Sequence, residues 1–183
     1  MPSGSSPMAS RWLDLNIDRR GAAYAKATKP SELAWEGIGG TIRIVATWTC
    51  EGESTSYTPK SGVLVVKHVV LSAVLDELVA ACLNVSRSES SSLSVVVHGT
   101  PLELDIKVDR EEAEIRILEY LDYSDRPRTL GVLIVTRNEL FLTVAETVEK
   151  FLKRLISANP SVGQTSAVRL LKEQSERFRE QVK

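Results

Sequence analysis

The feature that most constrains the fold is a series of short segments between residues 93 and 135 in which apolar and polar residues alternate. In the segment 102–109, leucine, isoleucine and valine occupy every second position and polar residues occupy the others. This period of two is typical of a β-strand with one buried face. Segments 93–97 and 113–117 repeat the pattern, whereas 130–135 is apolar nearly throughout, as expected for a strand covered on both faces. The phase of the alternation changes near Leu118, which indicates a β-bulge or a strand end there.

Three further segments are predicted to be strands. Residues 11–18 and 41–50 alternate in the same way, and 63–66 is a short apolar run. Between the first two, residues 19–39 contain Pro30 and three glycines, so we expect a loop there.

Three segments have the 3.6-residue period of an α-helix. Residues 67–87 are apolar nearly all round, so we expect other parts of the structure to cover both sides of this helix. Residues 138–158 carry one apolar stripe, with Asn138 as the expected N-cap and Pro160 just beyond the end. Residues 166–183 form a polar helix with a narrow apolar seam. That seam is expected either to dock on the 67–87 helix or to leave the outer side of that helix to a partner protein.

Short turns between the strands, together with few helices, predict an α+β fold. We expect one curved antiparallel sheet of about six or seven strands, with two main helices packed on one face and a further C-terminal helix. A β-sandwich with peripheral helices is the alternative. The length of 183 residues suits one domain. We assign residues 1–10 to a disordered leader, 11–158 to the single α+β domain, and 159–183 to a linker and the C-terminal helix.

The charge balance argues against two classes of partner. The chain has 23 lysine and arginine residues against 24 aspartate and glutamate residues. It therefore lacks the strong basic footprint of proteins that bind nucleic acid or anionic lipid. The longest apolar stretch, 69–85, is interrupted by polar and charged residues, which argues against a membrane span. Residues 1–10 show no secretory signal pattern, so we expect a cytoplasmic location.

Little in the sequence is suited to metal or covalent chemistry. Cys50 and Cys82 have no second cysteine or histidine at metal-ligand spacing, so we expect buried free thiols, no metal and no cofactor. The chain contains no phosphate-binding glycine loop, no zinc-protease motif and no nucleophile elbow.

The two histidines are expected to be surface or strand-end residues. A catalytic histidine needs a base partner or a nucleophile close in space. Asp76 and Glu77 lie eight and nine residues after His68, too far along the chain to support it locally. The sequence thus predicts no catalytic residue, and a non-enzyme. An enzyme whose site is assembled from scattered residues remains an open alternative, and it would need a pocket that gathers His68 or His98 with carboxylates.

Acidic residues with interleaved tyrosines are the most suggestive surface feature. They lie at an expected hairpin tip and at the next strand end, where carboxylates can meet a basic partner and tyrosines offer rigid contact area. A solvated turn that keeps the protein soluble is the alternative interpretation. The predicted partner-binding residues are Asp109, Glu111, Glu112, Glu119, Tyr120, Asp122, Tyr123 and Asp125.

These observations predict a non-enzymatic protein that binds another protein by surface complementarity. The most concrete version is a small bacterial immunity or inhibitor protein that neutralises a toxin. A chaperone or adaptor that caps its partner through the apolar helix and the C-terminal helix is the alternative. Self-association through residues 166–183 is compatible with both, and neither nucleic acid nor membrane is an expected partner.

Overall fold

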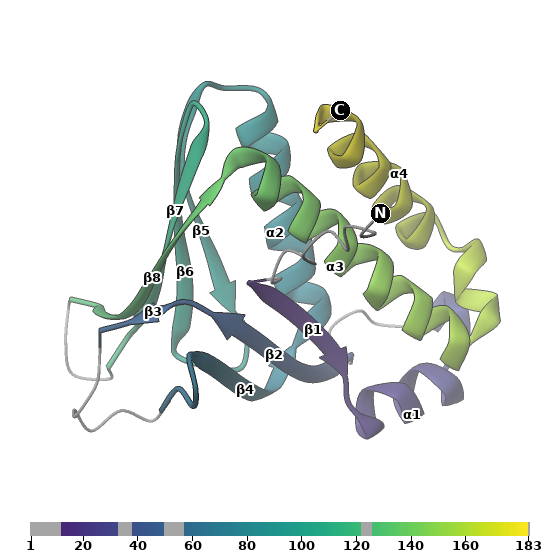
Figure 1. Cartoon of the computed structure of the whole chain (residues 1–183). Helices are drawn as coiled ribbons and strands as arrows, with labels where there is room; N and C mark the ends of the chain where they lie inside the picture. Colours follow the sequence, from purple (N-terminus) through teal and green to yellow (C-terminus); the bar gives the residue numbers. More distant parts are fainter. Residues whose placement is uncertain (1–11, 33–37, 50–56, 122–125, 183) are drawn as a thin grey trace, which may run out of the picture.

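The computed structural model describes residues 12–32, 38–49, 57–121 and 126–182. Within them the chain forms two antiparallel sheets and four α-helices, with the helices gathered on one side of the larger sheet (Figure 1). The α+β class is confirmed. In chain order the elements are β1 (Leu13–Ile17), α1 (Arg19–Ala27), η1 (Pro30–Glu32), β2 (Gly39–Val45), β3 (Thr47–Trp48), β4 (Val63–Val70), α2 (Leu71–Ser86), β5 (Ser90–Val97), β6 (Leu102–Asp109), β7 (Glu112–Glu119), β8 (Arg128–Thr136), α3 (Arg137–Ala158), η3 (Pro160–Gln164) and α4 (Ser166–Gln181).

The strands form two sheets instead of the single predicted sheet. The smaller sheet has the order β1-β2-β4 and the larger one the order β3-β8-β7-β6-β5. The predicted strand 41–50 contributes to both, because β2 pairs with β1 and β4 whereas β3, just after Ala46, pairs with β8. Alternation along one segment reports which side chains are buried, and it carries no information on which strand accepts the hydrogen bonds.

The core lies between the sheets and the helices. α2 contacts β1, β2 and β5 as well as α3 and α4, which explains why its sequence is apolar nearly all round. α4 packs mainly on α3, where the rings of Phe141 and Phe178 stack with their centroids 5.8 Å apart. The apolar seam of residues 166–183 is thus covered by the chain itself, and chiefly by α3 instead of α2.

Helix α1 corrects the prediction of a loop over residues 19–39. Asp18 caps the helix, since its Oδ1 accepts a hydrogen bond of 2.7 Å from the Gly21 N–H. Glycine is a common loop signal in a sequence, but Gly21 is required inside the helix for another reason. A Cβ at Gly21 would lie 2.4 Å from the carbonyl oxygen of Gly39, so only glycine lets α1 approach β2 this closely.

The boundary between β4 and α2 also differs from the prediction. The helix expected from residue 67 begins at Leu71, because β4 continues through Val70. In the pairing of β2 with β4, Gly40 faces Val69 and Thr41 faces Lys67, so His68 is the extra residue of a β-bulge and has φ of 61°.

The remaining predicted boundaries are close to those observed. The register of β7 with β8 shifts between Ile117 and Leu118, where the change of phase indicated a bulge. α3 ends at Ala158, as predicted, but Thr136 is its N-cap and forms a capping box with Glu139. The strand predicted over 93–97 begins earlier, at Ser90. Of the helices that the structure describes, none combines the length and the apolar character needed to cross a membrane.

Candidate interaction surface

The outer face of the larger sheet, turned away from the helices, carries a regular array of charged side chains. In β6 and β7 the residues that point toward the helices are buried, and those that alternate with them are half-buried or exposed, apart from Leu118, which is 9 % exposed. We call the outward-pointing charged set the acidic sheet face, because it contains five carboxylates and two cations. Its members are Glu103, Asp105, Lys107, Asp109, Glu112, Glu114 and Arg116.

The centre of the acidic sheet face is internally neutralised. Asp105 lies opposite Arg116 in the ladder, and Lys107 lies opposite Glu114. Arg116 Nε donates a hydrogen bond of 2.5 Å to Glu114, its neighbour on the same side of β7. The excess negative charge therefore lies at the two ends of the face.

At one end, Glu103 is grouped with Tyr120 and Val96. Val96 lies directly opposite Glu103 across the β5–β6 ladder, and the Tyr120 hydroxyl is hydrogen-bonded to Glu103. Partial desolvation and the negative charge of Glu103 raise the pKa of Tyr120. Tyr120 is 41 % exposed and Val96 is 39 % exposed. This end thus combines an aromatic ring, an apolar side chain and a carboxylate on one open surface.

At the other end, the β6–β7 hairpin presents Asp109, Glu111 and Glu112, all exposed. Asp109 and Glu112 are directly opposite each other in the ladder, so two like charges face one another at the tip. The hairpin backbone is fixed by its neighbours, since the Arg110 N–H donates to the carbonyl of Glu89 at 2.8 Å and the Arg137 side chain donates to the carbonyl of Arg110 at 3.3 Å.

The structure separates the predicted partner-binding residues into groups. Tyr120 and the hairpin acids lie at opposite ends of β7, about 26 Å apart along the strand. The residues that link them, Glu103, Asp105 and Glu114, were missed, although the alternation in 102–109 already placed its acids on one face. Asp122, Tyr123 and Asp125 lie outside the described residues.

Glu119 points to the other side of the sheet. It follows Ile115 and Ile117 on the face that turns toward the helices, and its side chain is 1 % exposed. Neither carboxylate oxygen has a hydrogen-bond partner among the described residues, and Arg128 is its cross-strand neighbour. The pKa of Tyr57 is raised by burial and by the charge of Glu119. Glu119 is accordingly part of a buried polar end of the sheet, and is not part of the acidic sheet face.

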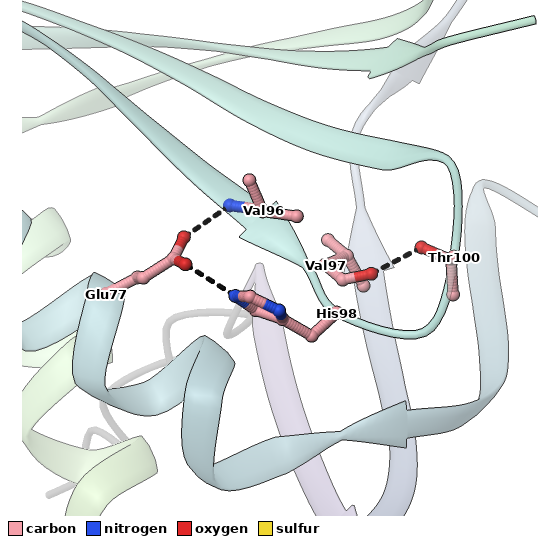
Figure 2. A network of polar contacts seen from close by, with 5 residues as sticks. All are labelled: Glu77, Val96, Val97, His98 and Thr100. Carbon is pink, nitrogen blue, oxygen red and sulfur yellow. Dashed lines mark hydrogen bonds and ion pairs between the residues drawn. The ribbon is translucent and has the colours of Figure 1, made fainter. Parts of the chain in front are cut away.

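A second polar arrangement, which the sequence did not reveal, connects α2 with the end of β5 (Figure 2). Glu77 Oε1 lies 2.5 Å from His98 Nε2, and Glu77 Oε2 accepts a hydrogen bond of 2.5 Å from the backbone N–H of Val96. The prediction considered the neighbours of His68 along the chain, and Glu77 reaches His98 only through folding. His68 itself is exposed on the β4 bulge.

Three cavities of the described region lie elsewhere. Those of about 590, 510 and 360 Å³ are lined by residues of β1, α1, η1, α3, η3 and α4. None of these three includes Glu77, His98 or His68 in its lining. A carboxylate–histidine pair can orient a general base, but the Glu77–His98 pair lines none of these three cavities.

Cys82 is buried and free, and burial raises the pKa of its thiol to about 12; Cys50 lies outside the described residues. Among residues 12–32, 38–49, 57–121 and 126–182, no three His, Cys, Asp or Glu side chains are grouped so that they could hold a metal ion.

Comparisons with known proteins found no match to this chain among protein-family models, curated proteins or solved structures. The function is therefore argued from the geometry of the acidic sheet face.

Proposed function

We propose that this protein acts without catalysis, by binding a partner protein of basic surface through the acidic sheet face. The observation that carries the proposal is the excess of carboxylates on one regular surface of β6 and β7, with Tyr120 and Val96 exposed beside Glu103. Complementary charge steers the approach of a partner and fixes its register, and exposed tyrosine supplies contact area at low conformational cost.

The backbone beneath the face supports this role. β6 is hydrogen-bonded to a neighbour on each side, and its pairing with β5 and β7 has no register shift. Charged side chains on such a strand are held at fixed spacing, so a partner spends little free energy on ordering them. A surface that serves only solubility would also carry charged residues. Solubility does not account for the exposed Val96 and Tyr120 side chains at one end of the face.

The concrete version of the proposal is an immunity or inhibitor protein that neutralises a bacterial toxin. Proteins that act on nucleic acid carry basic surfaces, because they must approach a chain of phosphates. An acidic face held on a rigid sheet is complementary to such a surface. The inhibitor would cover the basic surface of the toxin and exclude its substrate.

The chaperone or adaptor alternative has less support. It depends on an apolar surface offered by α2 and by the seam of residues 166–183. In the described structure Val168 and Phe178 are fully buried and Leu171 is 6 % exposed. The same burial weakens the case for self-association through this helix.

Binding of a decalysine peptide tests the proposal with a probe of defined charge. The triple variant Glu103→Lys, Asp109→Lys, Glu112→Lys removes the unneutralised acids from both ends of the face. Calorimetric titration at low salt should show about tenfold weaker binding, since three exposed ion pairs of about 0.5 kcal/mol each are lost.

A control with the same net charge separates a site from bulk charge. Glu173→Lys, Glu176→Lys, Glu180→Lys places three equal changes on exposed positions of α4. The proposal requires this variant to bind decalysine better than the first one does. Equal losses in the two triple variants would show that only net charge matters.

A photo-crosslinker at position 120 in native cells then identifies the partner. Inhibition is tested on the purified partner's own activity.

A further inference from the structure

The outer edge of β5 is open in the described structure. β5 is the last strand of the larger sheet, and it pairs with β6 over its whole length without a register shift. The N–H of Val96 points away from β6, since it donates to Glu77 on α2 (Figure 2). In an antiparallel ladder alternate residues share this direction. Ser90, Ser92 and Ser94 therefore direct their N–H and C=O groups outward, and all three residues are exposed.

The sequence of β5 contains none of the usual devices that protect an edge. Natural sheets blunt their edge strands with lysine or other charges, with proline, with bulges or with very short strands. The eight residues Ser90–Val97 include no charged residue and no proline, and their pairing has no bulge. Glu77 is the exception, because it covers the edge at Val96 alone.

We propose that the outer edge of β5 pairs, antiparallel, with the same edge of a second copy of this chain. Such contact is isologous, so each copy supplies the same uncharged surface. A charged peptide would find no complementary charge on β5 itself, whereas serine and backbone groups complement their own copy. The result is one continuous ten-stranded sheet. This proposal is independent of the function proposed above.

Two neighbouring features favour a second copy as the occupant. α2 runs beside β5 and leaves Ala80 exposed and Leu83 half-buried, so the approach of a copy also covers apolar atoms that the monomer does not. Electrostatic repulsion between the β6 acids of the two copies opposes this pairing only weakly. Asp105 and its symmetry mate would be separated by at least three strand spacings, about 14 Å, which exceeds the Debye length of about 8 Å at physiological salt.

Glu77 also fixes the register of the pairing. Because the N–H of Val96 is occupied, the free outward positions are Ser90, Ser92 and Ser94. A two-fold axis through Ser92 lets the outward N–H and C=O groups of all three serines form hydrogen bonds with the second copy. Ser92 then faces Ser92 of the second copy and Ser90 faces Ser94, and each facing pair exchanges two hydrogen bonds. The Ser90 carbonyl accepts from Ser88 Oγ at 3.0 Å, but its second lone pair stays available.

The mass in solution gives the first test. Light scattering behind a sizing column should give twice the monomer mass of 20.2 kDa for the full chain. Ser92→Pro removes only an outward N–H and is compatible with an edge strand, and it should give the monomer. Ser92→Lys places two like charges face to face and should do the same. Ser92→Thr keeps the donor and should leave the dimer intact.

Disulfide trapping tests the register. In a Cys50→Ser background, Ser92→Cys should form an intermolecular disulfide on mild oxidation, because directly opposed hydrogen-bonded residues have Cα atoms about 5.5 Å apart, within disulfide reach. Ser94→Cys should not, since it lies about 14 Å from its own copy. Circular dichroism verifies folding of each variant, and Ser92→Lys replaces Ser92→Pro if proline unfolds the chain.

Three results would overturn the proposal. The first is a monomeric mass for the natural sequence over the whole concentration range. The second is a dimer that persists in folded Ser92→Lys. The third is equal trapping of the 92 and 94 cysteines, which would indicate random collision. None of these results affects the decalysine test, so the two proposals fail separately.

Discussion

The Glu77 carboxylate binds His98 through one oxygen and the backbone N–H of Val96 through the other, each at 2.5 Å. One side chain of α2 thereby holds both the end of β5 and the first residue of the following turn. The turn is further fixed by Thr100, whose hydroxyl donates to the Val97 carbonyl at 2.6 Å.

Replacement of Glu77 should loosen this end of the sheet. Glu77→Ala is expected to lower the free energy of unfolding by about 1–3 kcal/mol, because a charged acceptor is removed from two partners. Glu77→Gln keeps an acceptor oxygen and should lose less. Urea unfolding measures both, with Glu89→Ala at an exposed loop position as the control. Equal stability of the Ala variant and the natural sequence would show that the network contributes nothing.

Asp76, one residue earlier on α2, should give the stability a pH dependence. Partial desolvation by the surrounding protein raises the pKa of this exposed carboxyl above the ordinary value of 3.8. A carboxyl with a raised folded-state pKa binds its proton more tightly in the folded chain, so its favourable contribution is present at low pH and is lost as the pH rises through the folded-state value. Asp76→Asn should therefore be more stable than the natural sequence at pH 7, and the difference should disappear at a pH below 3.8. Glu176→Gln, exposed on α4, is the control; a difference independent of pH would contradict this account.

The Cys82 thiol should be inert in the folded protein. It is 1 % exposed, and burial raises its pKa to about 12, so almost no thiolate forms at neutral pH. In a Cys50→Ser variant, a disulfide reagent at pH 8 should leave the folded chain unlabelled and should react fully in urea. Rapid labelling without denaturant would show that α2 opens readily.

Docking of α4 should depend on Phe178. Its ring is fully buried and stacks on Phe141 of α3. Phe178→Ala is expected to lower the free energy of unfolding by about 3–5 kcal/mol. Leu170→Ala, at a residue that is 55 % exposed on the same helix, should change it by no more than about 0.5 kcal/mol. A small effect of both substitutions would mean that α4 is only loosely attached.

The sequence was most informative where one face of an element is buried. The strands β6 and β7 and the helices α3 and α4 follow from their periodicity, because burial of one face imposes a repeat of 2 or 3.6 residues. It was least informative where the decisive interaction joins distant residues. The helical role of Gly21 depends on the carbonyl of Gly39, and the division into two sheets depends on the pairing of β3 with β8.

Contacts between distant residues also limited what the sequence could predict of the acidic sheet face. The acids of β6 were recognised as the exposed half of a strand, but their union with Glu114 and Tyr120 requires the β6–β7 register. Glu119 was misplaced because a carboxylate at a strand end is usually solvated, whereas its position on the same side as Ile117 turns it inward. The sequence indicated a change of phase near Leu118, whereas β7 keeps its phase against β6 through Glu119 and the register shift lies in its pairing with β8.

The sharing of one segment by both sheets sets the order in which the chain can be completed during synthesis. β1 and β2 can pair as soon as they are made, but Trp48 finds its partner, Gly131, more than 80 residues later. Until β8 emerges, one side of β3 has nothing to bond, and the larger sheet lacks the strand that joins it to the smaller one. A ribosome that stalls before residue 128 would thus hold a chain in which the first sheet is formed and the second is still open.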